Sequence, residues 1–175
     1  MKNIELLAPA GSFEKAKIAF LYGADAVYMG TSSLSLRSRV SVDDDELEET
    51  IKYAHNIGKK VYAAVNIYAF DEKYDEIINQ AKRLNEIKVD GAIISDGGVV
   101  EIFKEYAPDV EIHISTQASI SNYETALFYK ELGAKRLVLA RECSKEDIKR
   151  IKDETGLDLE CFIHGAMCTS ISGRC

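Results

Sequence analysis

The last stretch of the chain, "ECFIHGAMCTSISGRC", carries two cysteines, Cys168 and Cys175, that are separated by six residues. The small residues around them let the backbone turn and offer amide groups to an inorganic cluster. Two thiolates supply only half of the ligands that a four-iron cluster needs, and the spacing is not that of a zinc knuckle. By residue type the pair is either half of a cluster site or two ordinary thiols.

The same stretch offers a second kind of chemistry. His164 stands before Cys168 and could act as the base beside a nucleophilic thiol, as in a Cys/His hydrolase. Neither a G-x-S-x-G elbow nor an H-E-x-x-H zinc motif occurs in the chain. Cys143 and Cys161 fall at a predicted helix start and within a predicted strand, and we interpret both as small hydrophobic residues.

Short apolar segments alternate with helical patterns along the chain, and these elements must position the reactive residues. The predicted strands are residues 4–7, 25–29, 60–65, 91–95, 111–115, 136–140 and 157–163. Six connections separate these seven strands, and five are clear helices by the spacing of their apolar residues. Ser12 and Ser144 are predicted helix N-caps, and Gly23 is a predicted left-handed helix stop.

This alternation predicts a parallel α/β architecture, either a doubly wound open sheet or a TIM (β/α) barrel. No G-x-G-x-x-G follows the first strand, and the regular spacing over seven units favours the barrel. Seven strands do not close a barrel and would leave an unpaired edge. We therefore expect residues 1–175 to form the N-terminal part of an incomplete TIM barrel, as a fragment of a longer chain.

Polar residues follow most of the predicted strands. Barrel active sites lie at the C-terminal ends of the strands, so these residues are candidates for binding and proton transfer. Strand ends are often polar in any case, which accounts for part of the pattern. The candidates at these positions are Asn66, Asp96, Ser115, Gln117, Arg141, Glu142 and His164.

His113 lies within the predicted strand "EIHIS". Alternation places His113 and Ser115 on one face of the strand and the two isoleucines on the other. If Ile112 and Ile114 pack against helices, His113 points into the barrel, toward its mouth. A core histidine whose ring is hydrogen-bonded to a backbone carbonyl is the alternative.

Arg37 and Arg39 lie on the long loop after the second predicted strand. Over a barrel mouth, two guanidinium groups could clamp an anionic group of a substrate through bidentate hydrogen bonds. The alternative is that both are solvated loop charges.

The composition limits the possible partners and compartment. The chain has 29 acidic and 22 basic residues, a formal net charge of −7, which weighs against nonspecific nucleic-acid binding but allows a local basic cleft. We see no secretory signal and no apolar stretch long enough to span a bilayer. We therefore expect a cytoplasmic protein with reduced cysteines.

Several segments together resemble peptidase family U32, the collagenase-like peptidases. They are "LLAPAGS", "GADAVYMG", "LRSR", "ISDGG", "IHISTQ", "VLARE" and "ECFIHGAMCTSISGRC". The last resembles the family signature, since Cys168, Gly173 and Cys175 satisfy its C-x(4)-G-x-C form. The resemblance covers essentially the whole chain.

The resemblance implies a TIM-barrel protein longer than this chain, with a further C-terminal region. It implies a 4Fe-4S cluster held by four cysteines, of which Cys168 and Cys175 match the first two. Members with assigned roles hydroxylate transfer RNA, ribosomal RNA or the ubiquinone ring without using molecular oxygen. Prephenate is the implicated donor of the oxygen atom, and the resemblance implies the same class of reaction here. Older assignments call members proteases, and several members act with a related partner subunit.

Our leading hypothesis is an iron–sulfur hydroxylase of RNA or of a small aromatic ring, inactive in cluster chemistry without its missing ligands. The candidates to hold donor carboxylates or RNA phosphates are Arg37, Arg39 and Arg141. The candidates for proton transfer or orientation are His113, Gln117, Glu142 and His164. The alternatives are a peptidase, with Cys168 or a bound metal generating the nucleophile and His164 as base, and a non-enzymatic binding subunit of a pair.

Overall fold

The computed structural model describes residues 4–31, 34–35, 41–165 and 169–172. The strands are β1 (Leu7–Pro9), β2 (Ala26–Thr31), β3 (Ser41–Val42), β4 (Lys60–Val65), β5 (Gly91–Ile94), β6 (Glu111–Ile114), β7 (Arg136–Val138) and β8 (Asp158–Glu160). The helices are α1 (Phe13–Leu21), α2 (Asp44–Asn56), α3 (Tyr74–Glu86), α4 (Gly97–Tyr106), α5 (Tyr123–Leu132) and α6 (Lys145–Thr155). Two short 3-10 helices, η2 (Asp71–Lys73) and η3 (Thr116–Ala118), follow β4 and β6.

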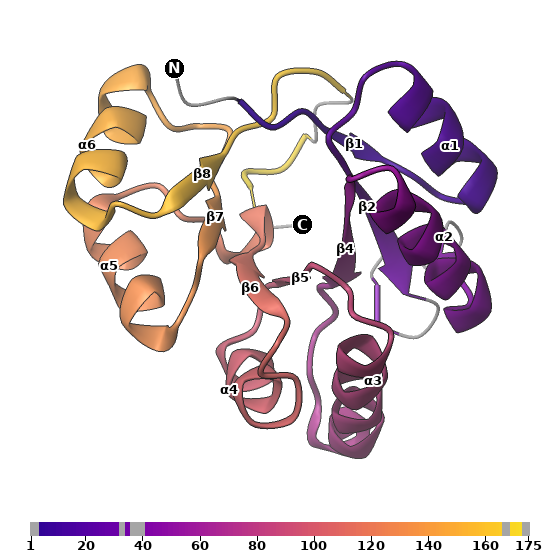
Figure 1. The fold of residues 1–175 in the computed structure, drawn as a ribbon. Coiled ribbons are helices and arrows are strands. Elements are labelled where there is room, and N and C mark those ends of the chain that lie inside the picture. The colour runs from indigo at the N-terminus through magenta and orange to yellow at the C-terminus, as the bar shows by residue number, and fades with distance from the viewer. Residues whose placement is uncertain (1–3, 32–33, 36–40, 166–168, 173–175) are drawn as a thin grey trace.

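The strands form one parallel sheet in the order β1-β2-β4-β5-β6-β7-β8, and β3 adds a short pairing to β2. The sheet curves so that α1 to α6 form an arc outside it, with β1 and β8 at the two ends of the arc (Figure 1). In the part of the chain that the structure describes, β1 and β8 do not pair with each other. The architecture is an incomplete TIM barrel, as the sequence predicts.

The sheet separates two apolar regions because successive side chains point to opposite faces. Ile112 and Ile114 belong to the large core between the sheet and the helices. On the inner face, Ala26, Tyr62, Ile93 and Val138 form a smaller cluster. The predicted outward direction of the two isoleucines is confirmed, and with it the inward direction of His113.

The helix ends follow the predicted capping pattern. Ser12 accepts a hydrogen bond from the Lys15 amide at the start of α1, and Ser144 forms a capping box with Asp147 at the start of α6. Gly23 has a positive φ of 101° just after α1, a conformation that glycine adopts without strain. Each of the six connections contains an α-helix, one more than the five that are clear from the sequence.

The predicted strand boundaries are wrong at the two ends of the sheet. The first strand begins at Leu7 rather than at residue 4, because the Leu6 amide donates to the Asp25 carboxylate instead of to a neighbouring strand. The last strand ends at Glu160, and residues 161–163 are exposed although their sequence is apolar. The two-residue strand β3 is too short to give a pattern in the sequence.

No helix among the described residues is long and apolar enough to cross a membrane.

Replacement of Gly91 by Ala tests the close packing inside the sheet. A Cβ atom at Gly91 would lie 3.0 Å from both Cε1 and Nε2 of the buried His113 ring and 3.1 Å from the Glu111 carbonyl oxygen. We expect Gly91→Ala to lower the free energy of unfolding by about 2 kcal/mol, measured by urea denaturation. Gly97→Ala is the matched control, because its Cβ would meet only Leu132, at 3.9 Å. Equal stabilities of the two variants would contradict this packing.

Candidate functional site

The carboxyl ends of β6 and β7 are joined by polar contacts that shape this end of the barrel. Ser115 follows β6, is buried, and its hydroxyl accepts a hydrogen bond from the Gln117 amide at 3.3 Å. The Thr116 hydroxyl donates to the Leu139 carbonyl at 3.2 Å, which ties η3 to the chain leaving β7. The side-chain oxygen of Gln117 is buried and has no hydrogen-bond partner among the described residues.

Ser172 lies at the same strand ends and stands between the two candidate cluster cysteines in the sequence. Its amide donates to the Glu142 carboxylate at 3.0 Å, and its hydroxyl accepts from the Arg141 amide at 3.1 Å. Its carbonyl accepts from the Ser119 hydroxyl, next to η3. The hydrogen bond from the Ser172 amide lowers the pKa of Glu142. Ser172 is therefore held against the ends of β6 and β7.

Two further candidates border this segment. The Arg141 guanidinium lies over the Phe162 ring, 4.4 Å from its centroid, so its charge faces the chain that leaves β8. His164 is exposed in that chain. Ser115, Gln117, Arg141 and Glu142 thus gather at two neighbouring strand ends, and His164 belongs to the segment that leads to Ser172.

Other candidates are not brought to this group. Asp96 caps α4, and its carboxylate accepts hydrogen bonds from the Gly98 and Val99 amides at 2.8 and 3.3 Å. Asn66 follows β4, on the far side of β5 from β6. The predicted substrate clamp and cluster ligands, Arg37, Arg39, Cys168 and Cys175, lie outside the described residues.

His113 is fully buried, but the prediction that it points toward the barrel mouth is wrong. Its Nε2 lies 3.3 Å from the Glu111 carboxylate at the start of β6, and its ring packs 4.6 Å from the Tyr62 ring between centroids. Burial lowers the pKa of His113, and hydrogen bonding to His113 lowers the pKa of Glu111. A neutral imidazole that donates from Nε2 to an ionised carboxylate fits the lowered pKa of each residue. This arrangement leaves the buried Nδ1 without a partner among the described residues. The ring is held by a carboxylate rather than by a backbone carbonyl.

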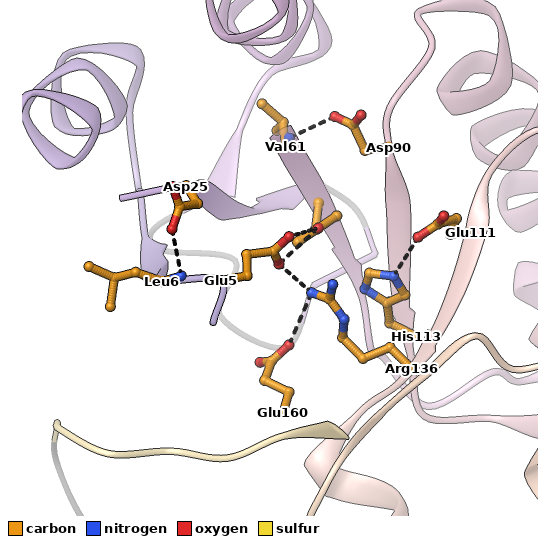
Figure 2. A network of polar contacts seen from close by, with 10 residues as sticks. Glu5, Leu6, Asp25, Val61, Asp90, Glu111, His113, Arg136 and Glu160 are labelled. Atoms are coloured by element: carbon orange, nitrogen blue, oxygen red, sulfur yellow. Dashed lines mark hydrogen bonds and ion pairs between the residues drawn. The ribbon is translucent and has the colours of Figure 1, made fainter. Parts of the chain in front are cut away.

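An ion network beside His113 was not predicted (Figure 2). Arg136, the first residue of β7, bonds through Nη1 to Glu5 at 2.6 Å and lies 3.9 Å from the Glu160 carboxylate. The Tyr62 hydroxyl donates to both oxygens of Glu5, at 3.0 and 3.1 Å, and the guanidinium lies 5.0 Å from the centroid of the Tyr62 ring. Burial raises the pKa of Tyr62 and raises the pKa of Glu160 to about 7.

Most of this network lies near the N-terminal ends of the strands, whereas Glu160 is the last residue of β8. Glu5 precedes β1, and Glu111 and Arg136 are the first residues of their strands. The sequence held a signal for it, since alternation from the inward Val138 makes Arg136 inward as well. A charged side chain at an inward strand position requires a partner of opposite charge.

The two cysteines that the structure describes differ. Cys143 is partly buried against the core, its thiol donates to the Ile120 carbonyl at 3.5 Å, and burial raises its pKa, as expected for a small hydrophobic residue. Cys161 is exposed and follows the end of β8, so the prediction that it lies within a strand is wrong. Within the described ranges, no group of three or more His, Cys, Asp or Glu side chains could hold a metal ion.

The fold and the site define an incomplete (β/α) barrel whose candidate residues gather at the carboxyl ends of its strands. The family model for peptidase family U32 matches residues 11–175, and the chain belongs to this family. It is 44% identical over 175 residues to the tRNA hydroxylation protein P1 of Bacillus subtilis, covering 99% of this chain and 42% of that protein. It is 35% identical over 173 residues to the 23S rRNA 5-hydroxycytidine C2501 synthase of Escherichia coli, covering 99% of this chain and 26% of the synthase.

The structure of the U32 peptidase Mk0906 has the same fold, with a TM-score of 0.75 at 18% identity, covering 91% of this chain and 68% of that one. The chain therefore spans less than half the length of the two RNA hydroxylation relatives.

Replacement of Arg136 by Met tests the ion network. The change leaves the carboxylates of Glu5 and Glu160 without their cation, and we expect the free energy of unfolding at pH 8 to fall by about 3 kcal/mol in urea denaturation. The free energy of unfolding should fall less in the double variant Glu5→Gln/Arg136→Met, because this variant also removes one of the two carboxylate charges that Arg136→Met leaves unpaired. Lys149→Met removes an exposed ion pair with Asp153 and should leave stability unchanged. A loss in Arg136→Met no greater than in Lys149→Met would contradict the network.

Glu160 predicts a pH dependence of stability. Its folded pKa of about 7 lies above the ordinary value of 4.5, so the folded state keeps a proton that the unfolded state loses. This stabilisation is complete below pH 4.5 and is lost as the pH rises through 7. Gln does not titrate, so Glu160→Gln should gain about 2 kcal/mol relative to wild type between pH 5 and pH 8.

The pH dependence is compared between wild type and Glu160→Gln because His113 also titrates. Its lowered pKa makes the free energy of unfolding rise with pH in both proteins, so its contribution cancels when one is subtracted from the other. Urea denaturation at a series of pH values measures it. Glu101→Gln, at an exposed position on α4, is the control and should show no such trend. A stability difference for Glu160→Gln that does not change with pH would contradict the raised pKa.

Proposed function

We propose that this chain is the N-terminal barrel part of a U32 protein that hydroxylates an RNA base, in transfer RNA or ribosomal RNA. Its similarity to two RNA hydroxylation proteins over almost its entire length supports the proposal. The observation that carries it is the attachment of Ser172 to the ends of β6 and β7. In (β/α) barrels this end of the sheet is where chemistry takes place.

Cys168 and Cys175 are proposed to supply two of the four ligands of a 4Fe-4S cluster, and the other two come from outside this chain. Thiolates are the ligands that iron–sulfur clusters prefer, and a loop of small residues leaves room for the cluster and its backbone hydrogen bonds. The anchored Ser172 is consistent with such a loop. When bound, the cluster would supply redox chemistry for a hydroxylation that does not use molecular oxygen, taking up electrons as the substrate carbon is oxidised.

The oxygen donor is proposed to be a carboxylate compound such as prephenate. Arg37, Arg39 and Arg141 are the residues of this chain suited to its carboxylates, because a guanidinium group binds a carboxylate through two parallel hydrogen bonds. Of these, Arg141 is next to Glu142, which binds the Ser172 amide. The same guanidinium groups would also bind RNA phosphates, which an acidic chain can do only through a local basic surface.

The remaining candidates divide by what their polar atoms already bind. The Gln117 side-chain oxygen is buried without a partner in the described chain and is suited to accept a hydrogen bond from a substrate amino or hydroxyl group. His164 is exposed and suited to proton transfer. His113 is engaged with Glu111 away from this end, and we no longer propose a catalytic role for it.

We further propose a cytoplasmic location and a related U32 subunit as a partner. A small aromatic ring remains the alternative substrate, since a base and a ring present the same planar target for hydroxylation. The peptidase alternative requires His164 beside a nucleophilic Cys168, and the likeness to Mk0906 supports only the shared fold.

Iron and acid-labile sulfide content tests the proposal. In the longest form that the gene encodes, purified without oxygen, we expect about four of each per chain. Cys168→Ser and Cys175→Ser should abolish cluster binding. They should also abolish hydroxylation, so that the hydroxylated nucleosides are missing from RNA digests analysed by mass spectrometry. Cys161→Ser, which removes an exposed cysteine of the same segment, is the control and should keep both.

Neither iron nor sulfide in the wild-type protein would overturn the cluster. Peptide cleavage that is lost in Cys168→Ser and is unaffected by removal of iron would favour the peptidase instead.

A further inference from the structure

We propose that Glu142 and Ser119 are positioning residues that, together with the Arg141 amide, hold Ser172, and with it residues 169–172, against the barrel. The relevance of this loop to chemistry rests on the proposed function. The attachment itself is a property of the described residues.

All three polar groups of Ser172 are satisfied by residues from other loops. The amide donates to Glu142, the hydroxyl accepts from the Arg141 amide, and the carbonyl accepts from Ser119. Arg141 and Glu142 follow β7, whereas Ser119 follows η3 after β6. Ser172 is therefore held by hydrogen bonds from the loops at two adjacent strand ends.

Burial distinguishes Ser172 from its surroundings. Ser172 is only 5% exposed, whereas the neighbouring Ile171 is 66% exposed. An exposed isoleucine beside a buried serine is the reverse of what the hydrophobic effect favours. The polar contacts, not apolar burial, must therefore hold this segment against the barrel.

The backbone of Ser119 supports a specific role for its side chain. Ser119 has a φ of 55°, in the left-handed region, which costs a residue with a Cβ about 1 kcal/mol. Glycine or asparagine would adopt this conformation more readily. A glycine would lack the hydroxyl that donates to Ser172.

Cys168 stands four residues before Ser172 and Cys175 three residues after it. A fixed Ser172 leaves only these few residues between each cysteine and an anchored point, so less conformational entropy would be lost if both bound one cluster. Glu142, which the sequence suggests for proton transfer, then acts through Ser172 rather than on the substrate.

Hydrogen exchange in the metal-free protein tests the attachment directly. We expect Glu142→Ala and Ser172→Ala to speed amide exchange in residues 169–172 at least tenfold, because the Ser172 amide loses its acceptor or the loop loses its anchor. Glu142→Gln keeps an oxygen acceptor and should restore most of the protection. Glu146→Ala, on the exposed first turn of α6, is the matched control and should exchange as wild type.

Exchange in residues 169–172 that is equally fast in wild type and in all these variants would overturn the proposal. A second measurement separates it from the proposed function. In iron-loaded protein, release of iron to a chelator should be several times faster in Ser172→Ala than in wild type. Faster exchange in a protein that binds no iron would keep the attachment and reject the cluster, whereas bound iron with unchanged exchange and unchanged iron release would do the opposite.

Discussion

The buried charge of Arg136 constrains the inside of this barrel. Its side chain is 12% exposed, and a guanidinium group in such a place is tolerated only with anions beside it. The chain supplies Glu5 from before β1 and Glu160 from β8, and Tyr62 from β4 binds the same Glu5. The network thus links the beginning of the chain to the last two strands across the interior of an unclosed sheet.

An apolar cluster lies beside this network on the inner face of the sheet. Leu7, Tyr28, Ile93 and Val138 pack on the inner face, together with the Tyr62 ring whose hydroxyl belongs to the network. Along β6 and β7, the charged Glu111 and Arg136 begin the strands, the apolar Val138 lies in β7, and the polar Ser115 and Gln117 follow β6. Glu160 connects the two polar regions along the chain, because it is the last residue of β8 and the segment toward Ser172 begins after it.

Local patterns predicted most of the fold. The apolar run in "KVYAAV" gives the boundaries of β4, and the serine caps give the starts of α1 and α6, because both signals depend on neighbours in the sequence. The network could not be predicted with its partners, since Arg136 and Glu5 are 131 residues apart. The prediction of strand ends was wrong where pairing stops early, as at residues 161–163. Their apolar character gives no sign that the backbone leaves the sheet.

The candidate site shows why polar residues at strand ends are poor evidence for catalysis when taken singly. The side-chain oxygens of Asp96 and Ser115 accept hydrogen bonds from backbone amides two residues further along the chain, and Glu142 accepts one from the Ser172 amide in the segment after β8. Parallel strands end in turns whose amides lack sheet partners, so the same polar residue types are required for folding. What separates Gln117 from these residues is a buried oxygen to which no described residue donates. A polar group that folding leaves unsatisfied is a better guide to the substrate than one that is polar and near the mouth.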